Sequence, residues 1–433
     1  DGLKFRVNFG PDITSYRNGV FLNGQSSARS GTSFASLSKN QTISYTLDNL
    51  ILYNKTVGKH DFGVTLLQSQ TQYTNEENSM SAENIKNVAN KWNALTKENV
   101  TLNAYSSNLV ETGLFSYMGR LTYGFDDKYL VTASLRYDSA SQLSKLNRRD
   151  QFTSASLAWR IDKEEFLQNI SWLNTLKLRA GYGVTGNAAV PAYGTQPQLE
   201  QVLYSTSSGV LNNLKLGNIE LGWEKTAQFN YGIDFGMFNN RISGSLEYYT
   251  SKTDDLLLER SIPTVLGYDK TLANIGKTEA NGLELTLNTV NIKTSNFEWS
   301  SSLSASWQKS KIVELQNGKF DDITNNRFIG KSQGIIYGFE SNGVWKPEDA
   351  AEMAKFNTAA NNPTLFTFGN ARPVDQNGDY KIDANNDRVI IGSTEPKYIA
   401  GLTNTFNYKN IELSIFVIGR FGYLYNAGGE NLS

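Results

Sequence analysis

The amino-acid sequence predicts an all-β fold, a transmembrane antiparallel β-barrel, and three observations predict it. Apolar and polar residues alternate with a period of two, aromatic residues stand near both ends of the apolar faces, and short turns alternate with long polar connections. Successive side chains of a strand point to opposite faces, so each segment has one apolar and one polar face. Strands that separate lipid from a polar lumen require this pattern.

The composition excludes several classes of protein and of metal site. The chain has 433 residues and a formal net charge of −1, from 41 Lys and Arg against 42 Asp and Glu, so no basic field indicates a nucleic-acid partner. Cysteine is absent and His60 is the one histidine, which excludes disulfides, zinc-thiolate sites and two-histidine metal sites. No apolar run approaches the length of a membrane-spanning helix, but barrel strands are short and only half apolar.

The alternation is clearest in Tyr129–Tyr137, Trp223–Phe235 and Phe297–Gln308. The apolar faces of these segments carry rings near both ends, which are Tyr129 and Tyr137, Phe229 and Phe235, and Phe297 and Trp307. Rings at both ends of an apolar strip are typical of two membrane–water interfaces. A soluble β-sandwich also alternates, so pattern alone leaves that alternative open.

In chain order the pattern predicts about fourteen strands. They are Leu3–Phe9, Ile43–Val57, Asp61–Tyr73, Leu114–Tyr123, Tyr129–Tyr137, Phe152–Trp159, Leu176–Tyr182, Trp223–Phe235, Ile242–Thr250, Asn281–Val290, Phe297–Gln308, Gly334–Trp345, Tyr398–Tyr408 and Ile411–Arg420. One helical stretch is expected, at Ser81–Trp92 in a connection.

The connections favour the barrel over the sandwich. Short turns are expected at 57–60, 125–128, 238–241, 294–296 and 409–410. Long polar loops are expected at 75–110, 138–149, 185–221, 253–277, 316–334 and 346–396, and 46 asparagines fall largely in turns and loops. Short periplasmic turns with long extracellular loops are typical of outer-membrane barrels.

Several segments resemble, in order, those of the SusC/RagA family of TonB-dependent outer-membrane transporters. The segments are Gly119–Arg136, Ser154–Arg160, Leu176–Asn187, Leu221–Thr226, Phe235–Gly244, Tyr248–Leu257 and Asn274–Glu284. The resemblance implies a barrel of 22 strands. Residues 1–433 would then be one partial barrel domain, with a plug and a TonB-contacting segment before Asp1 and closing strands after Ser433.

The resemblance also implies a function. It indicates a non-enzymatic, TonB-dependent importer of glycans or peptides in the bacterial outer membrane, as in nutrient uptake by Bacteroidetes, with a SusD-like surface lipoprotein as lid. An alternative is a SusC-like barrel that serves as a structural subunit, docked on other outer-membrane barrels without transport. A soluble sandwich or enzyme forms a third class. The residues that contact the substrate cannot be read from the sequence.

The sharpest chemical motif is a possible structural calcium loop. Oxygen ligands recur with the spacing of an EF-hand loop, and the candidate residues are Asp375, Asn377, Asp379, Lys381 through its carbonyl, Asp383 and Asp387. Tyr380 stands where glycine normally makes the sharp turn, and Asn386 replaces the bidentate glutamate, for which Asp387 is the substitute. The alternative is a surface turn held by Asx side-chain-to-backbone bonds.

Other motifs favour structural interpretations. Residues 181–186 spell G-x-G-x-x-G, but no helix pattern follows, so a strand entering a loop is expected rather than a cofactor site. His60 is expected to be solvated or interfacial, and the pairs Asp126-Asp127 and Glu164-Glu165 to lie in turns. Lys145, Arg148, Arg149 and Arg136 form a basic cluster that could attract anionic groups, for which lipid contact is the simpler interpretation. No catalytic site is predicted.

Overall fold

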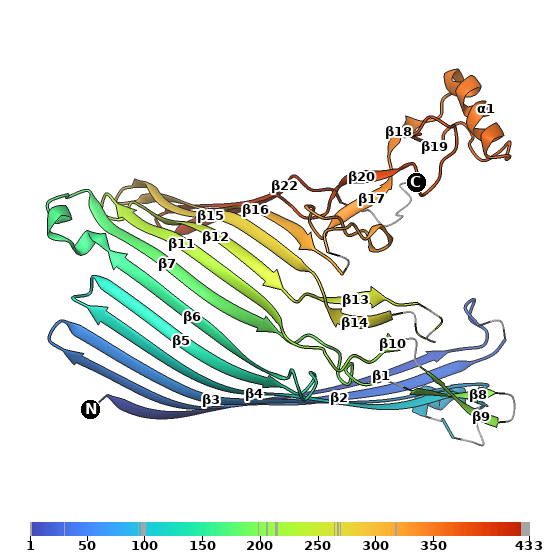
Figure 1. The fold of residues 1–433 in the computed structure, drawn as a ribbon, viewed down its shortest axis with the longest axis horizontal. Helices are drawn as coiled ribbons and strands as arrows, with labels where there is room; N and C mark the ends of the chain where they lie inside the picture. The colour runs from blue at the N-terminus through green and yellow to red at the C-terminus, as the bar shows by residue number, and fades with distance from the viewer. Residues whose placement is uncertain are drawn as a thin grey trace. The chain divides into compact units, whose positions relative to one another are not determined.

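The computed structural model describes residues 2–29, 31–93, 95–96, 101–197, 199–204, 207–212, 215–263, 265, 268, 270–316 and 318–425. Thirteen strands of this part of the chain form one large antiparallel sheet (Figure 1). They are β1 (Leu3–Leu22), β2 (Phe34–Val57), β3 (His60–Glu83), β4 (Thr101–Phe125), β5 (Tyr129–Ala140), β6 (Arg149–Arg160), β7 (Leu173–Asn187), β11 (Glu224–Met237), β12 (Ile242–Asp254), β15 (Lys277–Lys293), β16 (Phe297–Glu314), β21 (Tyr398–Tyr408) and β22 (Ile411–Phe421).

Strand order in the sheet follows chain order, with β1 and β22 as its two ends. Antiparallel neighbours joined by short turns give this order, because each hairpin returns the chain beside the strand it has just left. The remaining strands form small sheets in the connections. They are β8 (Leu199–Tyr204) with β9 (Ser207–Asn212), β10 (Lys215–Leu216) with β14 (Lys270–Asn274) and β13 (Leu257–Ser261), β17 (Ile335–Phe339) with β20 (Arg388–Ser393), and β18 (Ser341–Val344) with β19 (Ala371–Pro373).

The chain divides into two compact units. The first contains residues 1–158, 181–226 and 255–274, and the second contains residues 159–180, 227–254 and 275–433.

In the first unit, β2 and β3 are 24 residues long and β4 has 25. They pair without interruption from Val57↔His60 to Phe34↔Glu83 between β2 and β3. The sequence-based boundaries at Ile43, Tyr73 and Leu114 were too short. The extensions mix polar residues with scattered apolar ones such as Leu37 and Leu109 and lose the alternation. Their backbones still pair, and side chains join across them, as in the 2.8 Å hydrogen bond from Thr42 to Asn75.

The helix predicted at Ser81–Trp92 is wrong. β3 runs through Glu83, and only a 3-10 helix, η1 (Val88–Asn93), follows. Asn84 has a φ of 53°, which ends the strand, and the Ile85 amide donates to the Ser33 hydroxyl at 2.8 Å. This side-chain acceptor, distant in sequence, holds the backbone where a helix would have begun.

A small apolar core holds the connections of the first unit together. Its buried members are Ala140, Leu143, Phe152, Val190, Leu221 and Trp223. Phe152 and Trp223 meet edge to face with ring centroids 5.3 Å apart, and the Trp223 indole N–H donates to the Arg148 carbonyl at 3.0 Å. The predicted loops 138–149 and 185–221 are therefore held together, and Leu257 and Leu272 of the loop 253–277 pack against the same core.

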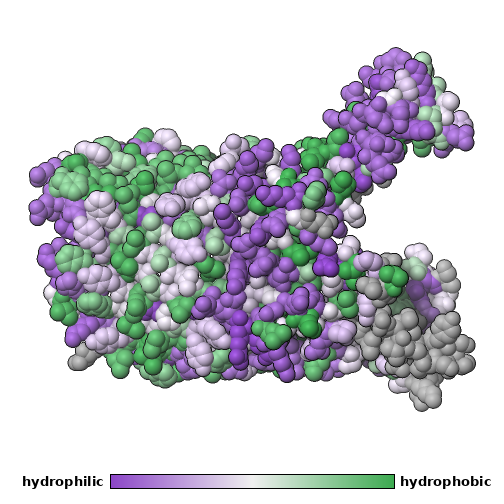
Figure 2. Space-filling model, in the orientation of Figure 1, coloured by the Kyte–Doolittle hydropathy of each residue, from purple (hydrophilic) through white to green (hydrophobic). Residues whose placement is uncertain are grey.

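The second unit carries a lobe, residues 341–387, in the connection between β16 and β21. The lobe contains β18, β19, the 3-10 helix η6 (Pro347–Asp349) and the α-helix α1 (Ala350–Ala359). Other 3-10 helices of this unit are η2 (Ile161–Lys163), η3 (Glu165–Leu167) and η5 (Ile323–Asn325). Figure 2 shows mostly hydrophilic side chains over the lobe.

The predicted strand Gly334–Trp345 is wrong as a member of the large sheet. It divides into β17 and β18, which belong to separate two-stranded sheets. The break between the two strands falls at Glu340, and Gly343, with a φ of 84° in the left-handed region, lies at an irregularity inside β18. Trp345 then turns into the lobe, where it is 1% exposed and contacts Phe356 with ring centroids 5.5 Å apart.

No helix within the described residues is long and apolar enough to cross a membrane.

The lobe core allows a matched test. Phe356 is 4% exposed, whereas Phe368 is 51% exposed. We expect Phe356→Ala to destabilise the lobe by about 3–5 kcal/mol, because the substitution removes a buried ring and leaves a cavity, and Phe368→Ala to have little effect. Hydrogen exchange of α1 amides measures this, and equal exchange in the two variants would contradict the assigned core.

Candidate functional site: the polar face of the strand wall

The large sheet presents two chemically different faces, and β5 illustrates them. Val131 and Leu135 are 38% and 50% exposed, and Tyr129 and Tyr137 flank them on the same face. Thr132, Ser134 and Arg136 occupy the other face. Large apolar side chains left exposed on one face, with polar groups gathered on the other, indicate a wall between an apolar medium and a polar one.

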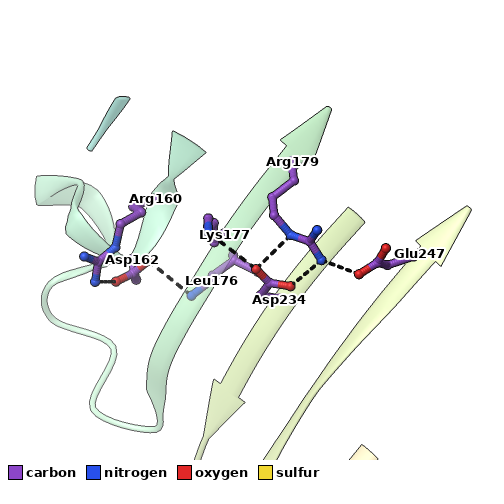
Figure 3. A network of polar contacts seen from close by, with 7 residues as sticks. All are labelled: Arg160, Asp162, Leu176, Lys177, Arg179, Asp234 and Glu247. Atoms are coloured by element: carbon purple, nitrogen blue, oxygen red, sulfur yellow. Dashed lines mark hydrogen bonds and ion pairs between the residues drawn. The ribbon is translucent and has the colours of Figure 1, made fainter. Parts of the chain in front are cut away.

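A network of charges on the polar face joins three strands of the second unit (Figure 3). Arg179 of β7 binds both carboxylate oxygens of Asp234 of β11, from Nε at 2.9 Å and from Nη2 at 2.8 Å. Arg179 Nη2 also donates to Glu247 of β12 at 2.6 Å, and Lys177 Nζ lies 3.7 Å from Asp234. The bidentate arrangement fixes the guanidinium plane against the wall.

A glycine leaves room for this network, and the network offsets the repulsion between two carboxylates. A Cβ added at Gly232 would lie 2.9 Å from Arg179 Nη2, so the missing side chain leaves room for the guanidinium. Glu247 stands directly opposite Glu284 in the β12–β15 register, where two carboxylates repel each other. Arg179 offsets this repulsion, and side chains about one-third exposed remain open to the polar medium.

A second polar group lies on the same face in the first unit. Arg136 binds Asp138 at 2.7 and 2.9 Å and the Ser116 hydroxyl at 2.9 Å. Ser116 and Asp138 are buried. Arg136 therefore belongs to the polar wall, not to a cluster with Lys145, Arg148 and Arg149, and this part of the basic-cluster prediction is corrected.

Small polar residues line a hollow of about 330 Å³ on the polar face of the second unit. Its lining includes Ser243, Asn288, Ser300, Ser302 and Thr403 from four neighbouring strands. Together with the charged networks, these hydroxyls and amides present hydrogen-bond donors and acceptors. The arrangement can contact polar solutes or a polar protein segment.

The other singled-out residues have structural surroundings. His60 is exposed beside the short turn and its Nδ1 lies 2.8 Å from the Tyr123 hydroxyl, with Phe125 in ring contact at 5.0 Å. Residues 181–186 lie inside β7, as expected for a strand, and a Cβ at Gly186 would lie 2.1 Å from the Phe152 ring. Asp126 pairs with Lys59 at 2.9 Å in the turn.

The predicted calcium loop is held by its own hydrogen bonds. Asp375 accepts from the amides of Gly378 and Tyr380, both at 2.7 Å. Asp387 is fully buried and accepts from the amides of Gln376 at 2.9 Å and Asp383 at 2.8 Å, which closes the loop.

Asp383 and Asp379 follow the same arrangement. The Asn386 side chain, and then the backbone amides of Asn385 and Asn386, donate to Asp383 and lower the pKa of its carboxyl group. Asp379 accepts from the Lys381 amide at 2.8 Å. Within the described residues, no three His, Cys, Asp or Glu side chains come close enough together to hold a metal ion. The calcium site, with Asn377 and the Lys381 carbonyl among its ligands, stays a prediction.

Comparison with known proteins places this wall in a family. The family model described as "TonB dependent receptor-like, beta-barrel" matches residues 1–430. A TonB-dependent receptor of Formosa agariphila is 33% identical over 98% of this chain and 44% of its own length. TonB-dependent receptor SusC of Bacteroides thetaiotaomicron is 30% identical over 84% of this chain and 36% of its own length.

Solved structures agree on the fold. The RagAB peptide transporter matches 97% of this chain and 46% of its own chain with a TM-score of 0.82 and 22% identity. The RagAB peptide importer in the open-open state matches 98% of this chain and 45% of its own chain, with a TM-score of 0.83 and 22% identity. The chain thus spans less than half the length of these relatives.

The sequence reasoning missed the network of Arg179, Asp234 and Glu247. Each was on the polar face of a correctly predicted strand, and these strands follow one another among the strands of the large sheet. Charged residues of opposite sign at polar positions of successive predicted strands were the available signal.

We expect Arg179→Ala to lower the free energy of unfolding by about 1–2 kcal/mol, since it removes the ion pair of Glu247 beside Glu284 and leaves Asp234 with Lys177 at 3.7 Å. Lys252→Ala is the matched control, because Lys252 pairs with Glu279 at 3.3 Å across β12 and β15 but is 68% exposed. The control should cost less than about 0.5 kcal/mol. Urea unfolding of the protein in lipid vesicles compares them, and equal midpoints for both variants would contradict the role of Arg179.

The calcium prediction has its own test. It requires that calcium raise the melting temperature of the lobe in the wild type and not in Asp375→Ala/Asp379→Ala. Magnesium at the same ionic strength controls for screening. Melting that does not depend on calcium in either protein would leave the hydrogen-bonded Asx turn as the whole explanation.

Proposed function

The chain belongs to the TonB-dependent receptor-like β-barrel family, and on that premise we propose that it forms the barrel wall of an importer in the bacterial outer membrane. The proposed importer is energised through TonB, takes up peptides or glycans, and works with a SusD-like surface lipoprotein as lid. The observation that carries the proposal is the division of the sheet into an exposed apolar face and a polar face with fixed charges. Membership of this family decides against the soluble sandwich.

In this proposal the polar face lines the transport path. The networks around Arg179 and Arg136 hold neighbouring strands together and also present polar groups inward. Such groups can replace part of the hydration of a polar solute or contact a plug domain, while the apolar face meets lipid. Family members are transporters, and no step of covalent chemistry is needed.

The relatives' names support the choice of substrate and partner. One relative at 30% identity is named SusC, and RagAB is described as a peptide transporter. The SusD-like lid and the glycan alternative rest on the resemblance of the sequence to the SusC/RagA family. The connections beyond the long-loop ends of the strands, including the lobe at residues 341–387, are the proposed contact region for the lid.

The proposal predicts three linked results for the complete natural protein that contains this chain. It should require detergent for extraction, co-purify with a surface lipoprotein, and support uptake of labelled oligopeptides or oligosaccharides that stops when the proton gradient is collapsed. A strain lacking the protein and the same strain complemented with it form the matched pair.

Each contrary outcome has a separate meaning. Partition into buffer without detergent would contradict the membrane wall. Co-purification with another barrel, with uptake unchanged by deletion, would favour the structural-subunit alternative.

A further inference from the structure

The loop between β5 and β6, residues 141–148, lies next to the end of the apolar face. The Ser134 and Ser154 hydroxyls are 2.6 Å apart, and the Ala140 amide donates to the Arg148 carbonyl at 3.0 Å. Both contacts fit one antiparallel register, in which Arg149 stands opposite Ser139. Ser139 is two residues beyond Tyr137 on the apolar face, a distance of about 7 Å along the strand. Arg149 therefore lies just past the ring that ends this face.

The two strands that this loop joins are short. β5 and β6 have 12 residues each, whereas β2 and β3 have 24 and extend further past the apolar face. A loop that follows a short strand stays at the height of lipid headgroups, because its strands end where the apolar face ends.

The cations of this loop are uncompensated. Lys145 and Arg149 are exposed, and no ion pair joins Lys145, Arg148 or Arg149 to an acid within the residues that the structure describes. The two acids closest in sequence, Asp138 and Asp150, are already paired, with Arg136 at 2.7 Å and with Lys225 at 2.7 Å. Both acids occupy even-numbered positions of this hairpin, so their side chains lie on the polar face, whereas the side chain of Arg149 lies on the other face. Neither acid of the hairpin thus lies on the side of Arg149.

Exposed apolar side chains accompany these cations. Leu146 is 83% exposed, and Ile219 is 65% exposed on the segment that the Asn147 side chain reaches through a 2.7 Å hydrogen bond to the Glu220 carbonyl. The loop is not loose, because Leu143 is buried and the Trp223 indole donates to the Arg148 carbonyl. The backbone therefore holds Leu146 in solvent at a free-energy cost that contact with acyl chains would remove.

We propose that this loop binds the phosphorylated headgroup of an outer-leaflet lipid, with Lys145 and Arg149 on the phosphate and Leu146 against the acyl chains. The inference rests on the proposed function, because it places the loop at the outer leaflet. Arginine and lysine are the usual phosphate ligands, and each cation near an anionic lipid surface contributes about 1 kcal/mol. An exposed leucine between cations fits an amphiphile rather than a free anion.

The test uses the complete natural protein in neutral detergent, with lipid A as probe and dephosphorylated lipid A as the matched lipid. Native mass spectrometry measures the lipid retained across a concentration series. We expect the wild type to prefer the phosphorylated form and Lys145→Ala/Arg149→Ala to lose about 30-fold in affinity, a factor of about five for each cation. Lys145→Arg/Arg149→Lys, which keeps both charges, should retain the preference.

A control variant removes the same charge elsewhere. Arg6→Ala/Arg120→Ala deletes two exposed cations from the polar face of β1 and β4 and should bind lipid A as the wild type does. Heat-modifiable gel mobility confirms that every variant is folded.

The outcomes separate the hypotheses. Equal retention of the two lipids, or equal affinity in Lys145→Ala/Arg149→Ala and the wild type, would overturn the lipid site and leave the importer untouched. Competition by millimolar inorganic phosphate at the same strength as lipid A would assign the cations to a free anion and also overturn it. A protein soluble without detergent would overturn the proposed function and the lipid site together.

Discussion

The constraint on which the structure depends is that a strand crossing lipid must bond all its backbone groups to neighbouring strands. Hydrocarbon offers no donors or acceptors, so each unpaired amide or carbonyl in it costs several kcal/mol. The uninterrupted ladder of β2 and β3, from Val57↔His60 to Phe34↔Glu83, meets this demand across a whole strand. Once the backbone groups are paired, the side chains of each face can be apolar toward lipid or polar toward water. Because successive side chains point to opposite faces, the sequence alternates with a period of two.

This separation explains why the charges are arranged as they are. The charged side chains of Asp234 and Glu247 lie on the polar face, and Arg179 joins them, so the network spans three strands. Asp138 and Asp150 at the β5–β6 hairpin also turn inward, each with its own cation. At this hairpin, Lys145 and Arg149 are exposed and no ion pair joins them to an acid in the described structure, at the height where an anionic headgroup would supply one. The alternation that places Asp138 and Asp150 on the polar face thus also places Arg149 on the apolar side of the sheet, next to the end of the apolar face.

The sequence predicted this much because alternation is a local signal. Strands such as Tyr129–Tyr137 and Ile411–Arg420 were correct within three residues, since apolar side chains had to alternate wherever lipid met the wall. The extensions of β2 to β4 were missed because their few apolar residues are scattered over both faces, so no alternation marks them. The divided strand at Gly334–Trp345 was missed because its two parts pair with the distant strands β20 and β19, which no local alternation indicates. α1 was missed because Phe356 is its one buried apolar residue, so no apolar stripe marks it in the sequence.

The candidate site was less predictable than the fold for a related reason. Its members come from strands far apart in sequence, and single motifs gave no indication of which would meet. Arg136 looked like a partner of Lys145, Arg148 and Arg149 because they are close in sequence, yet its even position in β5 turns it toward Ser116 and Asp138. In a sheet, two side chains lie on the same face according to whether their positions along the strands are odd or even, and closeness in sequence does not decide it. Function in such a wall is therefore read face by face, with the lumen side carrying paired charges and the lipid side carrying rings and an unpaired cationic edge.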